Sequence, residues 1–192
     1  LAASLDPAKH PPRPFPDDDW AWFAGRCAAL GISDPAPKRQ RLEAIFGHLM
    51  GVNAWLNLTR IDSPRDYLKL HVLDSLTGLT DRRLQHLSEG DRCIDLGSGG
   101  GYPGLPLALW QPQHRWTLID SRSKKAAFLA AALTLIPEAR FAEARHLRAR
   151  EAASPANDLH YGCQLVVARA VGQAVDPLEE SAPLIHHHGH LV

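Results

Sequence analysis

The strongest constraint on the fold is a run of glycines that follows a short apolar segment and precedes an apolar helix. Residues 93–96 form the apolar segment, and glycines stand at positions 97, 99, 100, 101 and 104. Glycines between a strand and a helix let the backbone approach a ligand without an intervening side chain. Residues 99–104 match the dinucleotide spelling G-x-G-x-x-G, which is a weak signal alone. The strand, the helix and the acids described next favour a ligand-binding loop over a plain flexible turn.

Two acids sit where this segment and the next one end. Asp95 lies two residues before the first glycine, and Asp120 closes the predicted strand 116–120. A carboxylate at Asp120 can accept hydrogen bonds from both ribose hydroxyls of an adenosine. Hydride transfer has no evident use for Asp95, whereas a cofactor with a positive amino-acid head does, through the loop or bound water. The structural alternative for Asp95 is a cap of a neighbouring loop.

The pattern of apolar residues changes near Asp91. Before it, helical spacing predicts three helices, at 17–30, 37–56 and about 63–79. After it, four predicted strands alternate with helices; the strands are 93–96, 116–120, 140–143 and 165–168, and the helices are 105–110, 123–136 and about 177–184. Alternation of this kind predicts an α/β domain with a mainly parallel sheet wrapped by helices.

We therefore divide the chain into three parts. Residues 1–16 hold five prolines and no periodicity, which predicts a disordered arm. Residues 17–88 form a helical cap, and residues 89–192 form the sheet domain. Because residues 189–192 are expected to open a strand, we expect the last strands of the domain to lie beyond Val192.

Composition excludes several classes of protein. Of 192 residues, 45% are hydrophobic, but the longest nearly apolar run, 126–136, is too short for the roughly 20 residues of a membrane span. No signal peptide is visible, and the three scattered cysteines form no CxxC pair, so we expect a reducing, cytoplasmic location without a disulfide scaffold or zinc site. Three histidines at 186–188 are expected at an exposed helix end rather than at a metal.

The net charge is zero, with 21 basic and 21 acidic residues, so a nucleic acid would have to meet a local basic patch. Arg122, Lys124 and Lys125 stand at the start of a predicted helix, where positive charge opposes the helix dipole. This placement suggests contact with RNA or cofactor, and a solvated helix end remains the alternative. His71 and Asp74 share one helical face, and we expect a structural hydrogen bond there between cap and sheet domain.

Four segments in order resemble one family. They are Asn-Leu-Thr at 57–59, His-Val-Leu-Asp-Ser at 71–75, the glycine segment with its two prolines at 95–106, and Leu-Ile-Asp-Ser at 118–121. Together they resemble the glucose-inhibited division B family, the bacterial guanine-N7 methyltransferases of small-subunit (16S) ribosomal RNA, over residues 38–192. The resemblance implies a class I methyltransferase fold, Rossmann-like with an N-terminal helical cap, and S-adenosylmethionine as methyl donor. It also implies a monomer that acts on RNA within the 30S subunit.

The resemblance and the patterns above give a set of expected site residues. Asn57 and Arg169 are expected to position the reactants. The expected cofactor-binding residues are Asp95, Gly97, Ser98, Gly99, Gly101, Tyr102, Asp120, Arg145, His146, Leu147 and Arg169. Arg122, Lys124 and Lys125 are expected to contact RNA, and no metal is expected. Leu147 replaces an acid that the family often has there, so we expect only backbone contacts to the adenine at 145–147.

The expected chemistry needs no general base, because guanine N7 carries a free lone pair and no proton. Transfer to cytosine C5 would need an activated cysteine, and no cysteine has a suitable context. Transfer to an exocyclic amine commonly uses an Asn/Asp-Pro-Pro-aromatic segment, which the sequence lacks. Two other functions remain open here: a nicotinamide-dependent oxidoreductase, and a non-catalytic ribosome-assembly factor on a methyltransferase fold.

Overall fold

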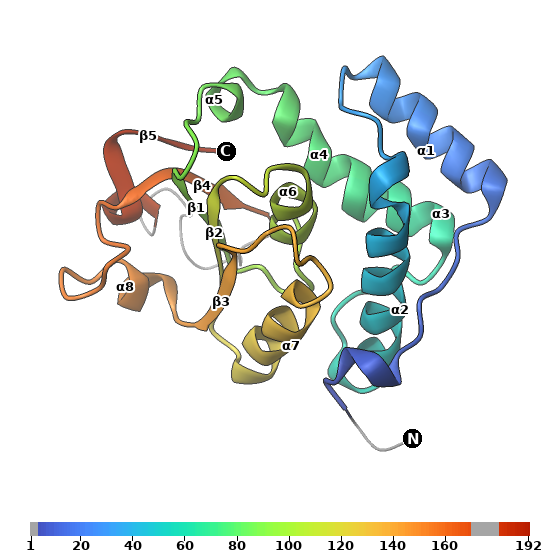
Figure 1. The fold of residues 1–192 in the computed structure, drawn as a ribbon. Coiled ribbons are helices and arrows are strands. Elements are labelled where there is room, and N and C mark those ends of the chain that lie inside the picture. Colours follow the sequence, from blue (N-terminus) through green and yellow to red (C-terminus); the bar gives the residue numbers. More distant parts are fainter. Residues whose placement is uncertain (1–3, 170–180) are drawn as a thin grey trace.

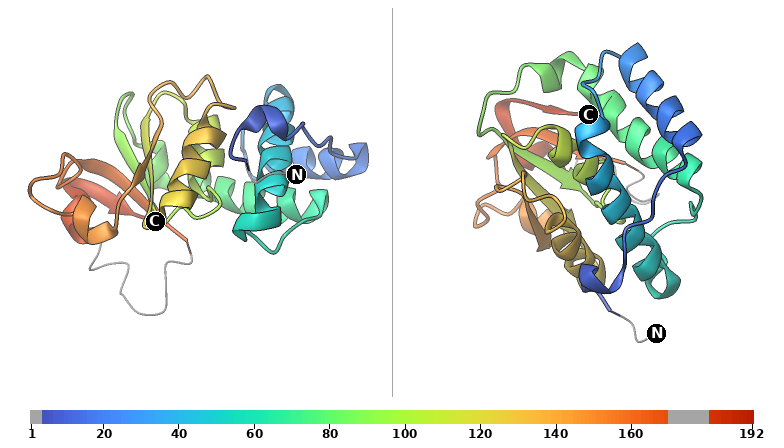
Figure 2. Two further views of the ribbon diagram at one scale, coloured as in Figure 1. Left: turned by 90° about the horizontal axis from the view of Figure 1, so that it is seen from below. Right: turned by 45° about the vertical axis from the view of Figure 1, so that its right-hand side comes forward.

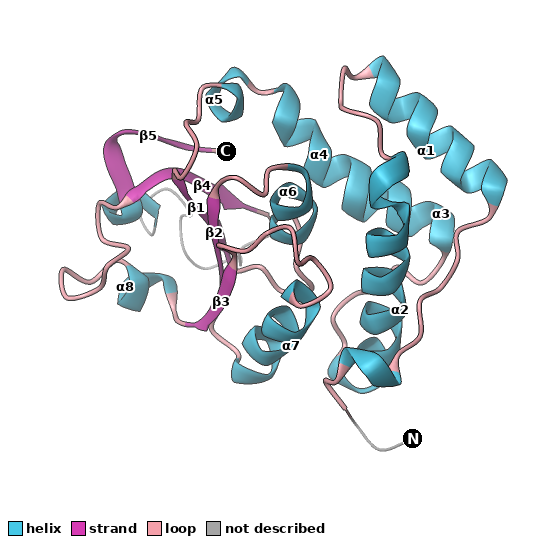
Figure 3. Ribbon diagram, viewed as in Figure 1, coloured by secondary structure: helices cyan, strands magenta, loops and turns pink. Residues whose placement is uncertain are grey.

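The structure, a computed structural model, describes residues 4–169 and 181–192. A five-stranded sheet carries helices on both faces, and a helical cap lies against one of these helical layers (Figure 1). In the described residues the strands all follow residue 91, after the helices of the cap (Figure 3). The cap consists of α1 (Asp17–Ala29), η2 (Ala36–Lys38), α2 (Arg39–Leu56), α3 (Pro64–Asp66), η3 (Tyr67–Leu73), α4 (Asp74–Thr77), η4 (Gly78–Thr80) and α5 (Arg82–Gln85).

The sheet domain alternates strands and helices in sequence. Its elements are β1 (Arg92–Leu96), α6 (Gly104–Trp110), β2 (Arg115–Asp120), α7 (Ser123–Leu133), β3 (Glu143–His146), α8 (Ala149–Ala152), β4 (Cys163–Ala168), η5 (Ala182–Leu184) and β5 (Ile185–Leu191). All pairings are parallel, and the strand order is β3-β2-β1-β4-β5. The order reverses beside β1, which is the arrangement of doubly wound nucleotide-binding sheets. The predicted α/β, Rossmann-like fold class is confirmed.

Alternation along the strands builds two cores. In β1, Cys93 points into the core that the sheet shares with α6, α7 and the cap, whereas Ile94 points into a second core on the opposite face. Ala152 of α8 and Leu184 of η5 close that second core. The cap packs mainly on the helices of the sheet domain, with α4 against α6 and α2 against α7, and it lies on one side of the sheet domain in Figure 2.

Most predicted elements are confirmed. The helices predicted at 17–30, 37–56 and about 63–79 correspond to α1, to α2 and to the helical run from α3 to η4, and β1, β2 and β4 lie within a few residues of their expected bounds. The third strand was predicted three residues too early: residues 140–142 form a turn in which Ala142 N–H bonds the Ala139 carbonyl, and β3 begins at Glu143. The three histidines do not end a helix, because residues 186–188 lie within β5, which pairs with β4. Residues 177–180 of the helix predicted at 177–184 lie outside the described residues, and its last residues form the 3-10 helix η5.

Residues 4–16, which we call the strap, differ from the disordered arm that the sequence predicts. The strap runs along α2 (Figure 2), and Phe15 at its end is 2% exposed in the cap core. Arg13 N–H donates to the Glu43 carbonyl of α2. Two glycines of α2, Gly47 and Gly51, leave the groove in which the strap lies. Within the strap, Pro7–Lys9 form the 3-10 helix η1, and the later prolines restrict φ in the segment that follows it.

No helix within the described ranges, 4–169 and 181–192, has both the length and the apolar character that crossing a bilayer requires.

We predict that Gly47→Ala lowers the free energy of unfolding by about 1–3 kcal/mol, because the new Cβ would overlap the Pro11 carbonyl oxygen. The matched control is Gly25→Ala in α1, where the new Cβ meets nothing within 4 Å and better helix propensity raises stability by up to about 1 kcal/mol. Urea unfolding measures both. An equal gain in stability for the two variants would show that the strap does not occupy the groove.

Candidate functional site at the carboxyl edge of the sheet

The residues expected at the site gather where the strand order reverses. Leu96 of β1 pairs with Ala168 of β4, so Gly97 and Arg169 follow side by side at the carboxyl edge. On the other side of β1, Asp120 ends β2 and pairs with His146 of β3. Ligands of open α/β sheets bind in the crevice at this edge. The topology therefore brings most of the predicted residues to one place.

The glycine loop, residues 97–103, follows an unusual backbone path. Gly97, Gly99 and Gly101 have φ values of 72°, 57° and 95°, in the left-handed region that side chains disfavour. A Cβ on Gly101 would also lie 2.7 Å from Leu105 Cγ. Ser98 stabilises the loop internally, since its N–H donates to the Ile119 carbonyl and its hydroxyl to the Asp95 carbonyl. The Ser98 hydroxyl is therefore used within the loop.

Asp95 is fully buried beneath this loop. Its Oδ2 accepts a hydrogen bond of 2.8 Å from Gly104 N–H at the start of α6, which is the capping role weighed from the sequence. Its Oδ1 has no hydrogen-bond partner among the described residues. Burial raises the pKa of Asp95 to about 6, against the opposing effects of the nearby Ser98 hydroxyl and the Gly104 hydrogen bond. A buried carboxylate with one free oxygen can still respond to a positive group above the loop.

Asp120 fixes the loop from the β2 side. Its Oδ2 accepts from Gly99 N–H at 3.0 Å and its Oδ1 from Arg122 N–H at 2.8 Å. Each carboxylate oxygen retains a second lone pair, so these bonds leave acceptor capacity for a ligand. Asp120 thus holds both the glycine loop and the start of α7 in place.

The residues that follow β3 make mainly protein contacts. Arg145 pairs with Asp158 at 2.6 Å and also with Glu143, so its guanidinium is held in ion pairs within the protein. Leu147 N–H donates to the Asp120 carbonyl, and His146 Nε2 lies 3.0 Å from the Ser121 carbonyl oxygen. The predicted backbone contacts to an adenine at 145–147 stay a prediction.

Arg169 joins the sheet to the cap. Its Nη1 donates to Asp74 Oδ2 at 2.7 Å and its Nη2 to His71 Nδ1 at 3.1 Å. The structural bond predicted between cap and sheet domain at His71 and Asp74 is therefore confirmed, and Arg169 is the partner that the sequence did not name. The His71 ring stacks on Tyr102 of the glycine loop, with ring centroids 4.2 Å apart.

Asn57 begins a loop, residues 57–60, that faces the glycine loop. It ends α2 with φ 51° and ψ 60°, a left-handed conformation that is uncommon outside glycine. A Cβ on Gly100 would lie 3.6 Å from the Leu58 carbonyl oxygen, so the two loops are neighbours. Residues 57–60 line a cavity of about 560 Å³. We call this segment the Asn57 loop.

Sequence reasoning missed Asn53, which holds the Asn57 loop. Its side-chain oxygen accepts from Leu58 N–H at 2.7 Å and Thr59 N–H at 2.9 Å, and its amide donates to the Thr59 carbonyl at 3.0 Å. An asparagine three residues before the last residue of a helix was the only available signal, and it does not predict a side chain that folds over the end of the helix.

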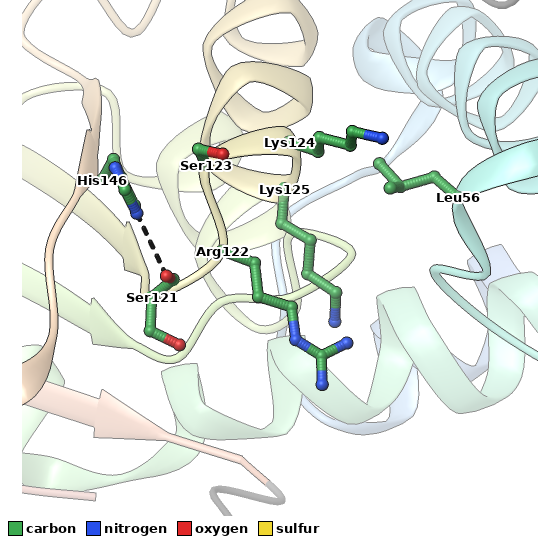
Figure 4. Close-up of a pocket in the computed structure, with 7 residues that line it drawn as sticks. All are labelled: Leu56, Ser121, Arg122, Ser123, Lys124, Lys125 and His146. Atoms are coloured by element: carbon green, nitrogen blue, oxygen red, sulfur yellow. Dashed lines mark hydrogen bonds between the residues drawn. The ribbon is translucent and has the colours of Figure 1, made fainter.

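A basic pocket of about 370 Å³ lies beside Asp120, at the start of α7. Its lining residues are Leu56, Ser121, Arg122, Ser123, Lys124, Lys125 and His146. Figure 4 shows Arg122 and Lys125 extending the same way and Lys124 extending toward Leu56 of the cap. None of these three cations forms an ion pair with a carboxylate in the part of the chain that the structure describes. The pocket is therefore suited to an anion.

The strand order, the glycine loop and the two acids define a doubly wound domain of the class that binds nucleotide cofactors. The family GidB, described as rRNA small subunit methyltransferase G, matches residues 38–192. The chain belongs to this family.

Relatives agree with that assignment. The chain is 39% identical over 170 residues to the ribosomal RNA small subunit methyltransferase G of Sorangium cellulosum, covering 87% of this chain and 68% of that protein. It is 35% identical over 148 residues to the protein of the same name from Myxococcus xanthus, covering 77% of this chain and 64% of that one. The chain thus spans about two thirds of the length of these relatives.

One solved structure is similar to part of this chain. It is a SAM-dependent methyltransferase from Geobacter sulfurreducens in complex with S-adenosyl-L-homocysteine. It covers 79% of this chain and 53% of its own at 21% identity, with a TM-score of 0.48. At this level of likeness the fold assignment rests on the strand order and the family match.

We predict that wild type loses free energy of unfolding, measured as its difference from Asp95→Asn, as pH rises from about 4 to about 6. The folded-state pKa lies above the ordinary value of 3.8, so in this window the folded state binds a proton that the unfolded state has lost. Urea unfolding at several pH values, without added ligand, measures the difference. A difference that stays constant with pH would mean that Asp95 is not desolvated as described.

Proposed function

We propose that the protein transfers a methyl group from S-adenosylmethionine to N7 of a specific guanine in small-subunit ribosomal RNA. The observation that carries this proposal is the glycine loop at the switch point, bounded by Asp95 and Asp120, in a chain that belongs to the GidB family. Membership of this family favours neither an oxidoreductase nor a non-catalytic assembly factor.

The residues at the carboxyl edge fit an adenosine cofactor with a cationic amino-acid end. Left-handed glycines keep side chains away from the backbone of the loop, and the free Oδ1 of Asp95 lies beneath it. We infer that residues 97–101 hold the amino-acid end, Asp120 accepts from the ribose, and residues 145–147 border the adenine. When bound, the cofactor supplies an electrophilic methyl group on a sulfonium.

The protein's own task is to exclude water and to align the target base. Guanine N7 attacks through its free lone pair, so no side chain has to remove a proton. Alignment alone can lower a barrier by up to about 7–11 kcal/mol in the best cases. Asn57 and Arg169, which border the glycine loop from the cap and from β4, are inferred to position the base.

RNA contact is inferred at the basic pocket. Arg122, Lys124 and Lys125 are free to neutralise backbone phosphates, and such contacts position RNA without reading its sequence. A base held in a duplex is out of reach, so an unpaired or flipped guanine is expected. We further propose that a monomer acts in the cytoplasm on the assembled 30S subunit.

One prediction of the proposed function concerns cofactor binding. Asp120→Ala should weaken S-adenosylhomocysteine binding at least tenfold, because charge-assisted hydrogen bonds contribute about 1.5–3 kcal/mol each. Calorimetry measures the affinity, and far-UV circular dichroism checks the fold. Asp62→Ala, at an exposed acid of the Asn57–Pro64 connection, is the control and should bind as wild type does. Unchanged affinity in folded Asp120→Ala would remove Asp120 from the site.

Another prediction of the proposed function concerns the reaction itself. Because N7 needs no base, the single-turnover rate at saturating cofactor and substrate should be nearly flat from about pH 6.5 to 8.5. Below about pH 6.5 it should also lack the tenfold fall per pH unit that a required histidine base would give. Borohydride and aniline treatment of the methylated RNA, followed by primer extension, should reveal one cleavage at one guanine. Methyl incorporation without an aniline-sensitive site would identify another acceptor atom and overturn the proposal.

A further inference from the structure

His71 is the one imidazole that contacts three separate parts of the carboxyl edge. It lies in η3, the π-helical stretch between α3 and α4, and is 8% exposed. Its Nε2 is 2.8 Å from Thr59 Oγ1 of the Asn57 loop, and its Nδ1 is 3.1 Å from Nη2 of Arg169. Its face stacks on Tyr102 of the glycine loop, with the ring planes 8° apart.

The partners of His71 fix where its proton lies. A guanidinium has donors only, so Nδ1 of His71 must accept from Arg169 and carries no proton. The ring proton is therefore on Nε2, where it donates to Thr59 Oγ1. Thr59 Oγ1 also accepts from Ile61 N–H at 3.0 Å, which holds the hydroxyl in place. The hydrogen-bond network thus assigns a neutral Nε2–H tautomer.

The electrostatic surroundings agree with a neutral ring. Burial and the charge of Arg169 together lower the pKa of His71 to about 4, against the opposing effect of Asp74. The phenols of Tyr67 and Tyr102 are the other titratable groups that face the ring. A ring that stays neutral at physiological pH is a fixed hydrogen-bond bridge and not a proton carrier.

The bridge continues on both sides of His71. Asn53 binds the backbone of the Asn57 loop through three hydrogen bonds, so Thr59 cannot shift independently of Asn57. On the other side, Arg169 is held by Asp74 Oδ2 and by the Leu70 carbonyl oxygen. The two residues inferred to position the base, Asn57 and Arg169, are therefore linked through a single side chain.

We propose that His71 is a positioning residue for the methyl transfer: it sets the Asn57 loop and Arg169 relative to Tyr102 and the glycine loop. The inference rests on the function proposed above. It assigns His71 no contact with the cofactor or the reacting atoms. Loss of its two hydrogen bonds should therefore slow the aligned transfer step more than it weakens cofactor binding.

The test compares His71→Phe, which keeps a stacking ring but loses both hydrogen bonds, with a matched control. His48→Phe is that control, because His48 is also a fully buried cap histidine, yet neither ring nitrogen has a partner among the described residues. The measurement is the single-turnover rate of methyl transfer to small subunits that lack the methyl group. We expect this rate to fall at least tenfold in His71→Phe and to equal that of wild type in His48→Phe. Both should bind S-adenosylhomocysteine within threefold of wild type.

Two further variants separate positioning from general destabilisation. His71→Gln can keep an N–H donor toward Thr59 and should recover part of the lost rate. Thr59→Val removes the same hydrogen bond from the other side, so its effect and that of His71→Phe should not add in the double variant. The inference would be overturned if the losses of rate in His71→Phe and Thr59→Val add in the double variant and His71→Gln recovers no rate. It would also be overturned if the loss of rate in each variant follows its fall in thermal stability.

Nitrogen-15 spectra of the wild-type imidazoles test the tautomer without any turnover. A protonated Nε2 and a bare Nδ1 on His71 from pH 5.5 to 8 are expected, and the reverse tautomer would overturn the inference. Wild-type protein that shows this spectrum but methylates no small subunit would refute the proposed function, and with it this role of His71. Active wild type together with a fully active His71→Phe would refute the role of His71 alone.

Discussion

The hydrogen bond from Gly104 N–H to the buried Asp95 carboxylate brings the start of α6 against the end of β1. A Cβ at Gly104 would lie 2.5 Å from Asp95 Oδ2 and 2.8 Å from Leu118 Cγ, so only glycine permits this approach. The glycine loop must then turn within a few residues, which requires the left-handed conformations at alternate positions. The burial of one carboxylate thus decides the shape of the edge at which ligands of such sheets bind.

The cap is joined to the sheet domain rather than merely adjacent to it. One continuous hydrophobic core extends from Phe15 of the strap through α2 to α7 and to one face of the sheet. Above that core, Arg169 links β4 to Asp74 and His71 of the cap. Apolar packing fixes the distance between the cap and the sheet domain, and the polar contacts of Arg169 fix how the two are aligned. The Asn57 loop and the glycine loop therefore keep a defined separation.

Charge is distributed unevenly although its sum is zero. The cations of the basic pocket at α7 are free of ion pairs within the described ranges, whereas Arg145, Arg39 and Arg83 are each paired with an acid. Paired arginines stabilise the fold locally, and unpaired cations beside Asp120 create the positive potential that a polyanion requires. Net charge alone therefore says little about an RNA partner for this chain.

The sequence alone determined the parallel sheet, the helical cap and the family, because apolar periodicity and the glycine spacing are local signals. It also placed Asp95, Asp120 and Arg169 at strand ends on one edge of the sheet, since strand ends can be located along the chain. The tertiary structure decided that the strap packs on α2, that β3 begins at Glu143, that Asn53 binds the Asn57 loop, and that Thr59, Arg169 and Tyr102 are the partners of His71. Those features depend on contacts between residues distant in sequence, such as His71 and Arg169, whose meeting is set by how the cap docks on α6 and α7. No pattern within a single segment records that docking.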